Sequence, residues 1–253
     1  MFELIKTASK LNNINSLIHV GGHTGQEVNF YKSLNLEKVI YFEPVKEFAD
    51  EIKTKIKNLP NFVVHNCALG NEVQSKLIYI ADKGINDNSG STSLLEPRKS
   101  DISFSKSQTI KVKKYTSFQY SNIDLAVLDT QGYELEVLKG FEDKITTFKF
   151  LIVEFSNFEG YINQTVYKDL NKFLVSNNFS FLTQRKKVLK IFPNSTSGSY
   201  GDALYINNNL LSDIQILKSK VLFILSNNLI SDVLIKYLSF ATWKNIFKKI
   251  LNN

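Results

Sequence analysis

The sequence predicts an α/β fold in which a mostly parallel sheet is covered by helices on both faces. Short apolar segments typical of buried strands alternate with longer segments whose apolar residues recur at helical spacing. In addition, a glycine-rich turn at 21–25 joins the first apolar segment to a helix. A chain of 253 residues is long enough for one such domain, expected over 1–207, and a smaller extension over 208–253.

The elements are expected in a regular order along the chain. Residues 1–15 form a helix or arm, and Thr24 is expected to cap the helix that follows the glycine turn. Pro44 suits the first position of the next helix, and 67–71 (CALGN) is typical of a loop. The expected strands are 17–20, 38–42, 61–66, 76–80, 110–118, 124–129, 150–155, 179–183 and 203–206, and the expected later helices are 45–56, 132–140 and 165–176.

The glycine turn is typical of a nucleotide site. Gly21, Gly22 and Gly25 allow backbone conformations with positive φ and the close approach of a ligand. Glu43 follows the strand 38–42 and lies 18 residues after Gly25, where a carboxylate hydrogen-bonds a ribose hydroxyl in nucleotide-binding α/β units. These features predict an adenosine-type cofactor. The six-residue glycine fingerprint of dinucleotide sites is missing, which argues against a nicotinamide-dependent oxidoreductase.

Three carboxylates stand at or near the ends of different predicted strands, namely Glu43, Asp129 and Glu154. Ligands of such sheets bind at the carboxyl ends of the strands, so we expect these acids to converge beside the glycine turn. For each acid alone, the alternative is a surface residue that caps the next helix.

Composition excludes several classes of protein. The net charge of +7 is modest, and without an arginine-rich cluster it predicts no nucleic-acid partner. The single cysteine, Cys67, cannot form an internal disulfide or a cysteine-pair zinc site. The N-terminal residues lack the pattern of a signal peptide, and no apolar run is long enough to span a bilayer. The expected location is therefore the cytoplasm.

Two segments do not fit the alternation of strands and helices. Residues 82–97 are too long and polar for a simple turn, and 84–97 is the candidate substrate lid. Residues 208–253 contain no glycine or proline and predict amphipathic helices, the last with a basic face. These helices suit a peripheral membrane surface or a partner, or they pack on the protein itself or on a second copy.

The motifs of the chain resemble those of the FkbM family of S-adenosylmethionine-dependent methyltransferases over about residues 14–207. The run from Asp129 to Gly140 is the most specific of them. The resemblance implies a seven-stranded Rossmann-like sheet of the class I methyltransferase type, and transfer of methyl groups to hydroxyls of sugars or other small acceptors. The motifs are IHVGGHTGQE (18–27), VIYFEP (39–44), NCALGN (66–71), NSGSTSLLEP (88–97), LDTQGYELEVLKGF (128–141), LIVEF (151–155) and GDALYI (201–206).

The resemblance also implies roles for individual residues. Glu43, next to Pro44, would take the ribose hydroxyls, and Asp129 and Gln131 would lie near the sulfonium and the substrate. Asp129, Glu134 and Glu154 are the first candidates for removing the proton of a hydroxyl acceptor, ahead of His19, His23 and His65. Gly21, Gly22, His23, Thr24 and Gly25 would hold the methionine and ribose parts of S-adenosylmethionine, and Cys67, Ala68 and Leu69 would lie near the adenine.

His19 departs from the family pattern, which commonly has an acid two residues before the glycine turn. It is either a neutral hydrogen-bonding residue of the core or a proton acceptor in a changed site. His19 also keeps open a non-catalytic binding or assembly protein that docks through 208–253. No sequence feature demands a metal and none is predicted, although Asp129 and Glu154 together would suit Mg²⁺.

Overall fold

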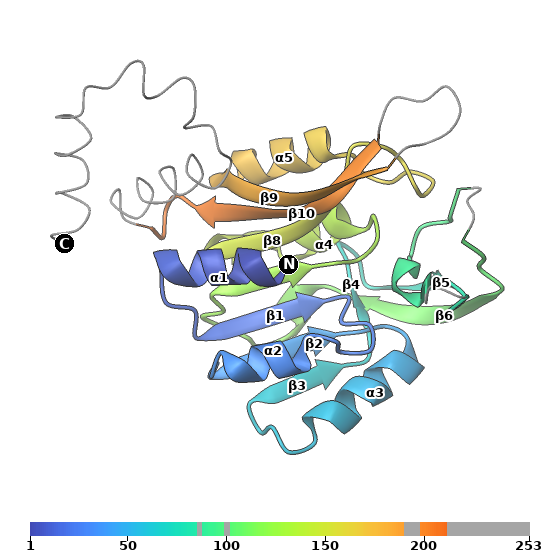
Figure 1. Cartoon of the computed structure of the whole chain (residues 1–253), viewed down its shortest axis with the longest axis horizontal. Coiled ribbons are helices and arrows are strands. Elements are labelled where there is room, and N and C mark those ends of the chain that lie inside the picture. The colour runs from blue at the N-terminus through green and yellow to red at the C-terminus, as the bar shows by residue number, and fades with distance from the viewer. Residues whose placement is uncertain (85–87, 99–101, 190–197, 212–253) are drawn as a thin grey trace, which may run out of the picture.

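The computed structural model describes residues 1–84, 88–98, 102–189 and 198–211 (Figure 1). Its centre is a seven-stranded sheet with the order β3-β2-β1-β7-β8-β10-β9. The α/β class and the seven-stranded, mostly parallel sheet are therefore confirmed. The strands of this sheet are β1 (Ser16–Val20), β2 (Lys38–Phe42), β3 (Phe62–His65), β7 (Leu125–Leu128), β8 (Phe150–Ser156), β9 (Phe179–Leu189) and β10 (Gly198–Asn207).

Five strands of the sheet, from β3 to β8, run parallel, so their carboxyl ends lie along one edge. β10 is antiparallel to β8, and β9 is antiparallel to β10. The chain crosses back through helices between parallel strands, as parallel pairing requires. The acids that follow β2 and β7 therefore emerge at the same edge, where ligands of such sheets bind.

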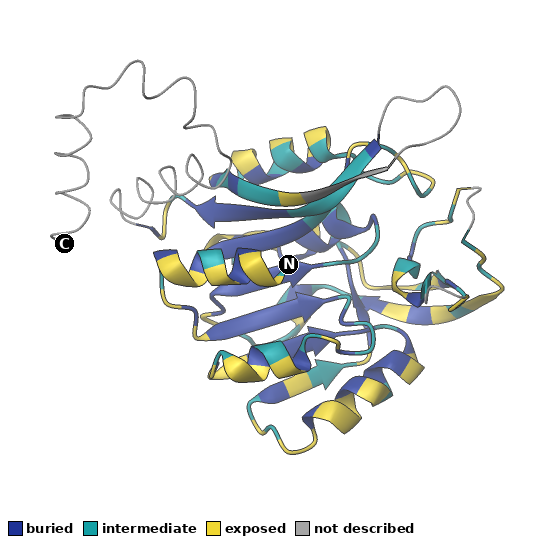
Figure 2. Ribbon diagram, in the orientation of Figure 1, coloured by how far each residue is buried: buried dark blue, intermediate teal, exposed yellow. Residues whose placement is uncertain are grey.

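Helices cover both faces of the sheet, and the side chains of β1 alternate between the two layers. Leu17 packs with α1, α2 and part of α3, whereas Ile18 packs with α4 and α5. Figure 2 shows the central strands buried and the outer faces of the helices exposed. The helices are α1 (Phe2–Leu11), α2 (Val28–Ser33), α3 (Lys46–Ile56), α4 (Glu134–Gly140) and α5 (Tyr167–Ser176), with 3₁₀ turns at Asn88–Ser91, Tyr115–Ser117 and Glu142–Thr147.

A second, three-stranded sheet of β4 (Ala68–Leu69), β5 (Gln74–Ile80) and β6 (Lys106–Lys113) flanks the first (Figure 1). The prediction of a loop at 67–71 was wrong in part, because Ala68 and Leu69 pair with Val112 and Lys113. A two-residue strand leaves no periodicity in the sequence. The strand predicted at 110–118 lies earlier, at Lys106–Lys113, and pairs with β5.

The prediction that Thr24 caps the following helix was wrong. α2 begins at Val28 with Glu27 as its N-cap, and the Thr24 hydroxyl lies 3.4 Å from His23 Nδ1 instead. The glycine turn is therefore longer than expected, with Gly25 N donating to Gly22 O at 2.8 Å before the helix begins. Pro44 likewise precedes α3, which begins at Lys46.

The helices expected in 208–253 lie outside the described residues from 212 onward. The predictions of a membrane surface, of self-association and of partner docking through this extension remain predictions. In the described ranges, no helix combines the length and apolarity that a membrane crossing needs.

Candidate active site

The glycine turn is packed between the ends of two strands. Gly21 N donates to Phe42 O on β2 at 2.9 Å, and Gly21 has a φ of +86°. A Cβ at this position would lie 1.8 Å from the backbone oxygen of Asp129, at the end of β7. Only glycine therefore lets the turn pass this close to Asp129 with this backbone conformation.

Glu43 braces the same turn from the end of β2. Its Oε2 accepts a hydrogen bond from His23 N and its Oε1 accepts one from Val45 N, both at 2.8 Å. Only 4% of the residue is exposed, and this burial raises its pKa to about 8. Each carboxylate oxygen has two lone pairs, so Glu43 keeps acceptor sites for the hydroxyls of a ribose.

A cavity of about 150 Å³ lies between the turn and the small sheet. Of the residues predicted to hold a cofactor, nine line it and three do not. Gly25 lies against Ile52 of α3, Cys67 is buried in the core, and the Thr24 carbonyl accepts from Lys55 Nζ. The nine that line it are Gly21, Gly22, His23, Glu43, Pro44, Ala68, Leu69, Asp129 and Gln131.

Asp129, Gln131 and Glu154 form a hydrogen-bonded cluster at the end of β7 and on β8. The Gln131 side chain donates to Asp129 Oδ1 and to Glu154 Oε2, each at 2.8 Å. Gln131 reaches both because its backbone is left-handed, with a φ of +54°. The two carboxyl groups also share a hydrogen bond, and burial and the charge of Asp129 hold the pKa of Glu154 well above its usual range.

Glu134, the third predicted acid, contacts the backbone that supports this cluster. Its Oε1 accepts hydrogen bonds from Thr130 N and Thr130 Oγ1 at 2.9 Å and from Gly132 N at 3.1 Å. Burial raises its pKa to about 7. Glu134 therefore holds the loop between β7 and α4 in place, and it also lines the second cavity described next.

A second cavity of about 330 Å³ adjoins the first, and Gln131 lines both. Glu134 and Glu154 form its polar wall. Its aromatic wall was not predicted from the sequence, because these residues lie in loops and on β8 and β10, and only Phe155 belongs to one of the motifs. The aromatic residues are Phe104, Phe155, Phe158, Tyr161 and Tyr200.

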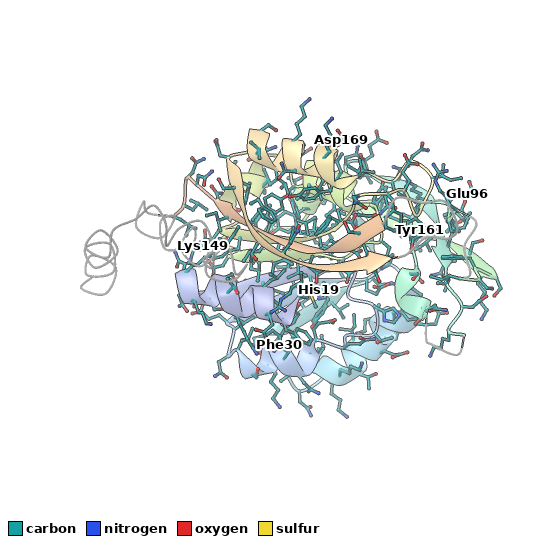
Figure 3. The ribbon with its side chains drawn as sticks, turned by 45° about the horizontal axis from the view of Figure 1, so that its top comes forward. His19, Phe30, Glu96, Lys149, Tyr161 and Asp169 are labelled. Atoms are coloured by element: carbon teal, nitrogen blue, oxygen red, sulfur yellow. The ribbon has the colours of Figure 1, made fainter. Side chains whose placement is uncertain are left out.

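The segment 88–98 lies over the junction of the two cavities. Ser89 Oγ is 3.0 Å from His23 Nε2, and Ser93 Oγ donates to the Gln131 carbonyl at 2.7 Å. Tyr161 Oη donates to the Ser91 carbonyl at 2.7 Å, and Glu96 and Tyr161 lie on the same side of the molecule (Figure 3). The described part of the predicted lid therefore lies at the site.

The His19 side chain on β1 contacts Tyr31 of α2 and Tyr41 of β2. It is 1% exposed, and its Nδ1 is 3.1 Å from Tyr31 Oη. Burial lowers its pKa to about 4, so the imidazole is neutral at neutral pH. The structure thus agrees with the prediction of a neutral, hydrogen-bonded core residue.

The residues of the first cavity fit S-adenosylmethionine. Glu43 offers free lone pairs for a ribose, and the backbone of the glycine turn lies beside Glu43 without side chains that would fill the space. The apolar side chains of Phe48, Leu69 and Leu94 form a slot that suits an adenine ring. Among the described residues, no group of three or more His, Cys, Asp or Glu could hold a metal ion.

The sequence model of the Methyltransferase FkbM domain matches residues 19–181, more than half of the chain. The chain belongs to this family. S-adenosylmethionine is the cofactor of the family, in agreement with the fit of the first cavity. The strand order and the family match together confirm the resemblance stated from the sequence motifs. No curated protein matches the chain.

Similar solved structures include an FkbM methyltransferase from Methylobacillus flagellatus KT, 16% identical, with a TM-score of 0.46. The match covers 76% of this chain but 43% of that protein, so the chain spans under half of its length. TrmK from M. capricolum with bound S-adenosylhomocysteine is 12% identical over 99% of this chain and 94% of its own, with a TM-score of 0.44. Magnesium protoporphyrin IX methyltransferase from Synechocystis PCC 6803 with bound S-adenosylmethionine is 10% identical over 82% and 76%, with a TM-score of 0.47.

Proposed function

We propose that the chain transfers a methyl group from S-adenosylmethionine to a hydroxyl of a sugar or another small glycan-like acceptor. The observation that carries the proposal is the carboxyl pair at the junction of two cavities. Asp129 lines the cavity that fits the cofactor, Glu154 lines the other, and Gln131 lines both. A group that removes a proton from an acceptor must reach both compartments.

S-adenosylmethionine supplies a methyl group on a sulfonium, which an acceptor oxygen can attack. As the new C–O bond forms, the C–S bond of the sulfonium would break with release of S-adenosylhomocysteine, and the Asp129 carboxylate would accept the proton of the hydroxyl. Glu154 and Gln131 hold Asp129 in place through hydrogen bonds. The cavity walls bring the acceptor to the methyl carbon and exclude water, and such positioning supplies much of the acceleration.

The second cavity has the chemistry of a site for a polyhydroxylated ring. Its five aromatic side chains offer apolar surface to the C–H faces of a ring. Its carboxyl groups accept hydrogen bonds from hydroxyls. The cytoplasmic location and the absence of a nucleic-acid partner, expected from the sequence, stay predictions.

The test incubates the purified chain with S-adenosylmethionine labelled in its methyl group and a panel of acceptors. The panel contains monosaccharides, nucleotide sugars, oligosaccharides, RNA and a protein digest. Label recovered as a methyl ether on a sugar oxygen, and absent with Asp129→Asn, is the expected result. Label on nitrogen or in RNA would overturn the proposal. Binding of S-adenosylhomocysteine without transfer to any acceptor would favour the non-catalytic binding protein.

A further inference from the structure

Three carboxylates line the first cavity, Glu27, Glu43 and Asp129. Two of them are committed to other groups of the protein. Both oxygens of Glu43 accept backbone N–H groups, and Asp129 is bound to Gln131 and Glu154. Glu27 differs from both, because within the described ranges no hydrogen bond from another residue to its carboxylate is found.

In the described part of the chain, Glu27 also lacks a close cationic partner, although the charges of Lys55 and of the N-terminus act on it from a longer distance. Its Oε2 is 3.9 Å from His19 Nδ1, and no described lysine or arginine lies within ion-pairing distance of it. His19 is neutral, because burial lowers its pKa to about 4. The Glu27 side chain is 15% exposed, and burial raises its pKa above the usual range. A carboxylate in this setting is stabilised when a cation occupies the cavity beside it.

The geometry points to Glu27 as the carboxylate that binds the ammonium group of the methionine part of S-adenosylmethionine. This inference rests on the proposed function. The cofactor carries its ammonium on its amino-acid part. The glycine turn, which ends two residues before Glu27, lines the cavity and would hold this part of the cofactor.

His19 lies beside Glu27 but does not neutralise its carboxylate. The His19 Nδ1 is 3.1 Å from Tyr31 Oη and 3.9 Å from Glu27 Oε2. A neutral imidazole in the layer below the turn leaves the negative charge of Glu27 unpaired. That charge therefore remains available to a ligand in the cavity.

The test measures binding rather than turnover, by calorimetric titration with two ligands. One is S-adenosylhomocysteine, and the other is 4-(5′-adenosylthio)butanoic acid, the same molecule with hydrogen in place of the α-ammonium. We expect the native chain to bind S-adenosylhomocysteine at least about tenfold more tightly than the deaminated ligand. Glu27→Gln is expected to bind the two ligands equally, with its affinity for the deaminated ligand unchanged or increased.

Glu47→Gln is the matched control, because Glu47 is an exposed acid on α3 outside the cavity. It should keep the full preference for the ammonium. Should Glu27→Gln not fold, Glu27→Asp retains the charge on a shorter side chain and should show an intermediate preference. A preference that survives in Glu27→Gln overturns this inference alone. Failure of the native chain to bind S-adenosylhomocysteine overturns the inference together with the methyltransferase proposal.

Discussion

Glu154 holds the proton that it shares with Asp129 across the carboxyl ends of two parallel strands. Asp129 directly follows β7, and Glu154 lies on the adjacent strand β8. Burial and the negative charge of Asp129 raise the pKa of Glu154 well above its usual range. Burial also raises the pKa of Asp129, but the hydrogen bonds from Gln131 and Glu154 oppose this rise. The pair therefore carries one negative charge, and that charge rests on Asp129.

Asp129→Asn is expected to lower kcat by about 10²–10⁴-fold, because the amide cannot accept the acceptor's proton. The Kd for S-adenosylhomocysteine should stay within a few-fold of that of the native chain. Radiolabel transfer measures kcat and calorimetry measures Kd. Glu154→Gln is the matched control, since its side-chain amide can still donate to Asp129, and it should retain more activity than Asp129→Asn. Unchanged kcat in Asp129→Asn would remove the proton-acceptor role.

The pH profile of kcat/KM should have an acidic limb above the ordinary pKa of an aspartate. Desolvation by burial is the largest influence on Asp129 and raises its pKa, so the carboxylate gains a proton at a higher pH than an exposed Asp. Activity is therefore lost as the pH falls through this raised pKa. Initial rates at low acceptor concentration between pH 4.5 and 8 would show the limb. A flat profile over this range would contradict an Asp129 base.

The sheet and the wall of the site formed by the glycine turn and Glu43 could be predicted from the sequence, because these features leave local patterns in it. The strand 38–42 and the spacing of Glu43 are visible as an apolar run and an offset. Tyr161 could not be predicted, because it reaches the site through the pairing of Pro97 with Tyr161 and through Ser91, contacts between distant segments. Glu27 lies within a motif but no role was predicted for it, because its exposure to the cavity depends on where α2 begins.

Glu134 is expected to act through the loop that it supports rather than through proton transfer. Glu134→Gln keeps an oxygen that can accept the three hydrogen bonds from Thr130 and Gly132, so kcat should fall less than about tenfold. Glu134→Ala leaves those buried donors unpaired and should lower the free energy of unfolding by about 2–4 kcal/mol. Urea unfolding and kcat would be measured for both variants. Loss of activity in Glu134→Gln as large as in Asp129→Asn would assign it a direct role in proton transfer.

Stability without cofactor is expected to fall as the pH rises from 6.5 to 8. The pKa of Glu43 rises to about 8 in the folded chain, against an ordinary value of 4.5, so the folded state holds a proton that the unfolded state has released. Glu134, with a pKa of about 7, and Glu154, with a pKa well above its usual range, act in the same direction. His19 acts in the opposite direction, but only below about pH 6.5.

The free energy of unfolding should therefore decrease by about 2 kcal/mol between these pH values. Urea unfolding at pH 6.5 and pH 8 measures the difference. Glu43→Gln lacks the titrating group and should show a smaller decrease, although the loss of one backbone acceptor lowers its stability at both pH values. A native chain that is more stable at pH 8 than at pH 6.5 would contradict the raised pKa.

Gly21→Ala is expected to destabilise the fold and to disrupt the cofactor cavity together. An alanine Cβ would lie 1.8 Å from the Asp129 backbone oxygen, at a φ of +86° that disfavours any side chain. The ends of β1 and β7 must then move apart, at an expected loss of about 3 kcal/mol or more in the free energy of unfolding. Gly90→Ala is the matched control, since its Cβ would meet nothing within 4 Å. Thermal unfolding with and without S-adenosylhomocysteine tests both effects. Without ligand the Gly90 variant should keep the native Tm, whereas Gly21→Ala should lose both the native Tm and its rise with ligand. A native Tm in Gly21→Ala would mean that the turn does not pack against Asp129 as closely as described.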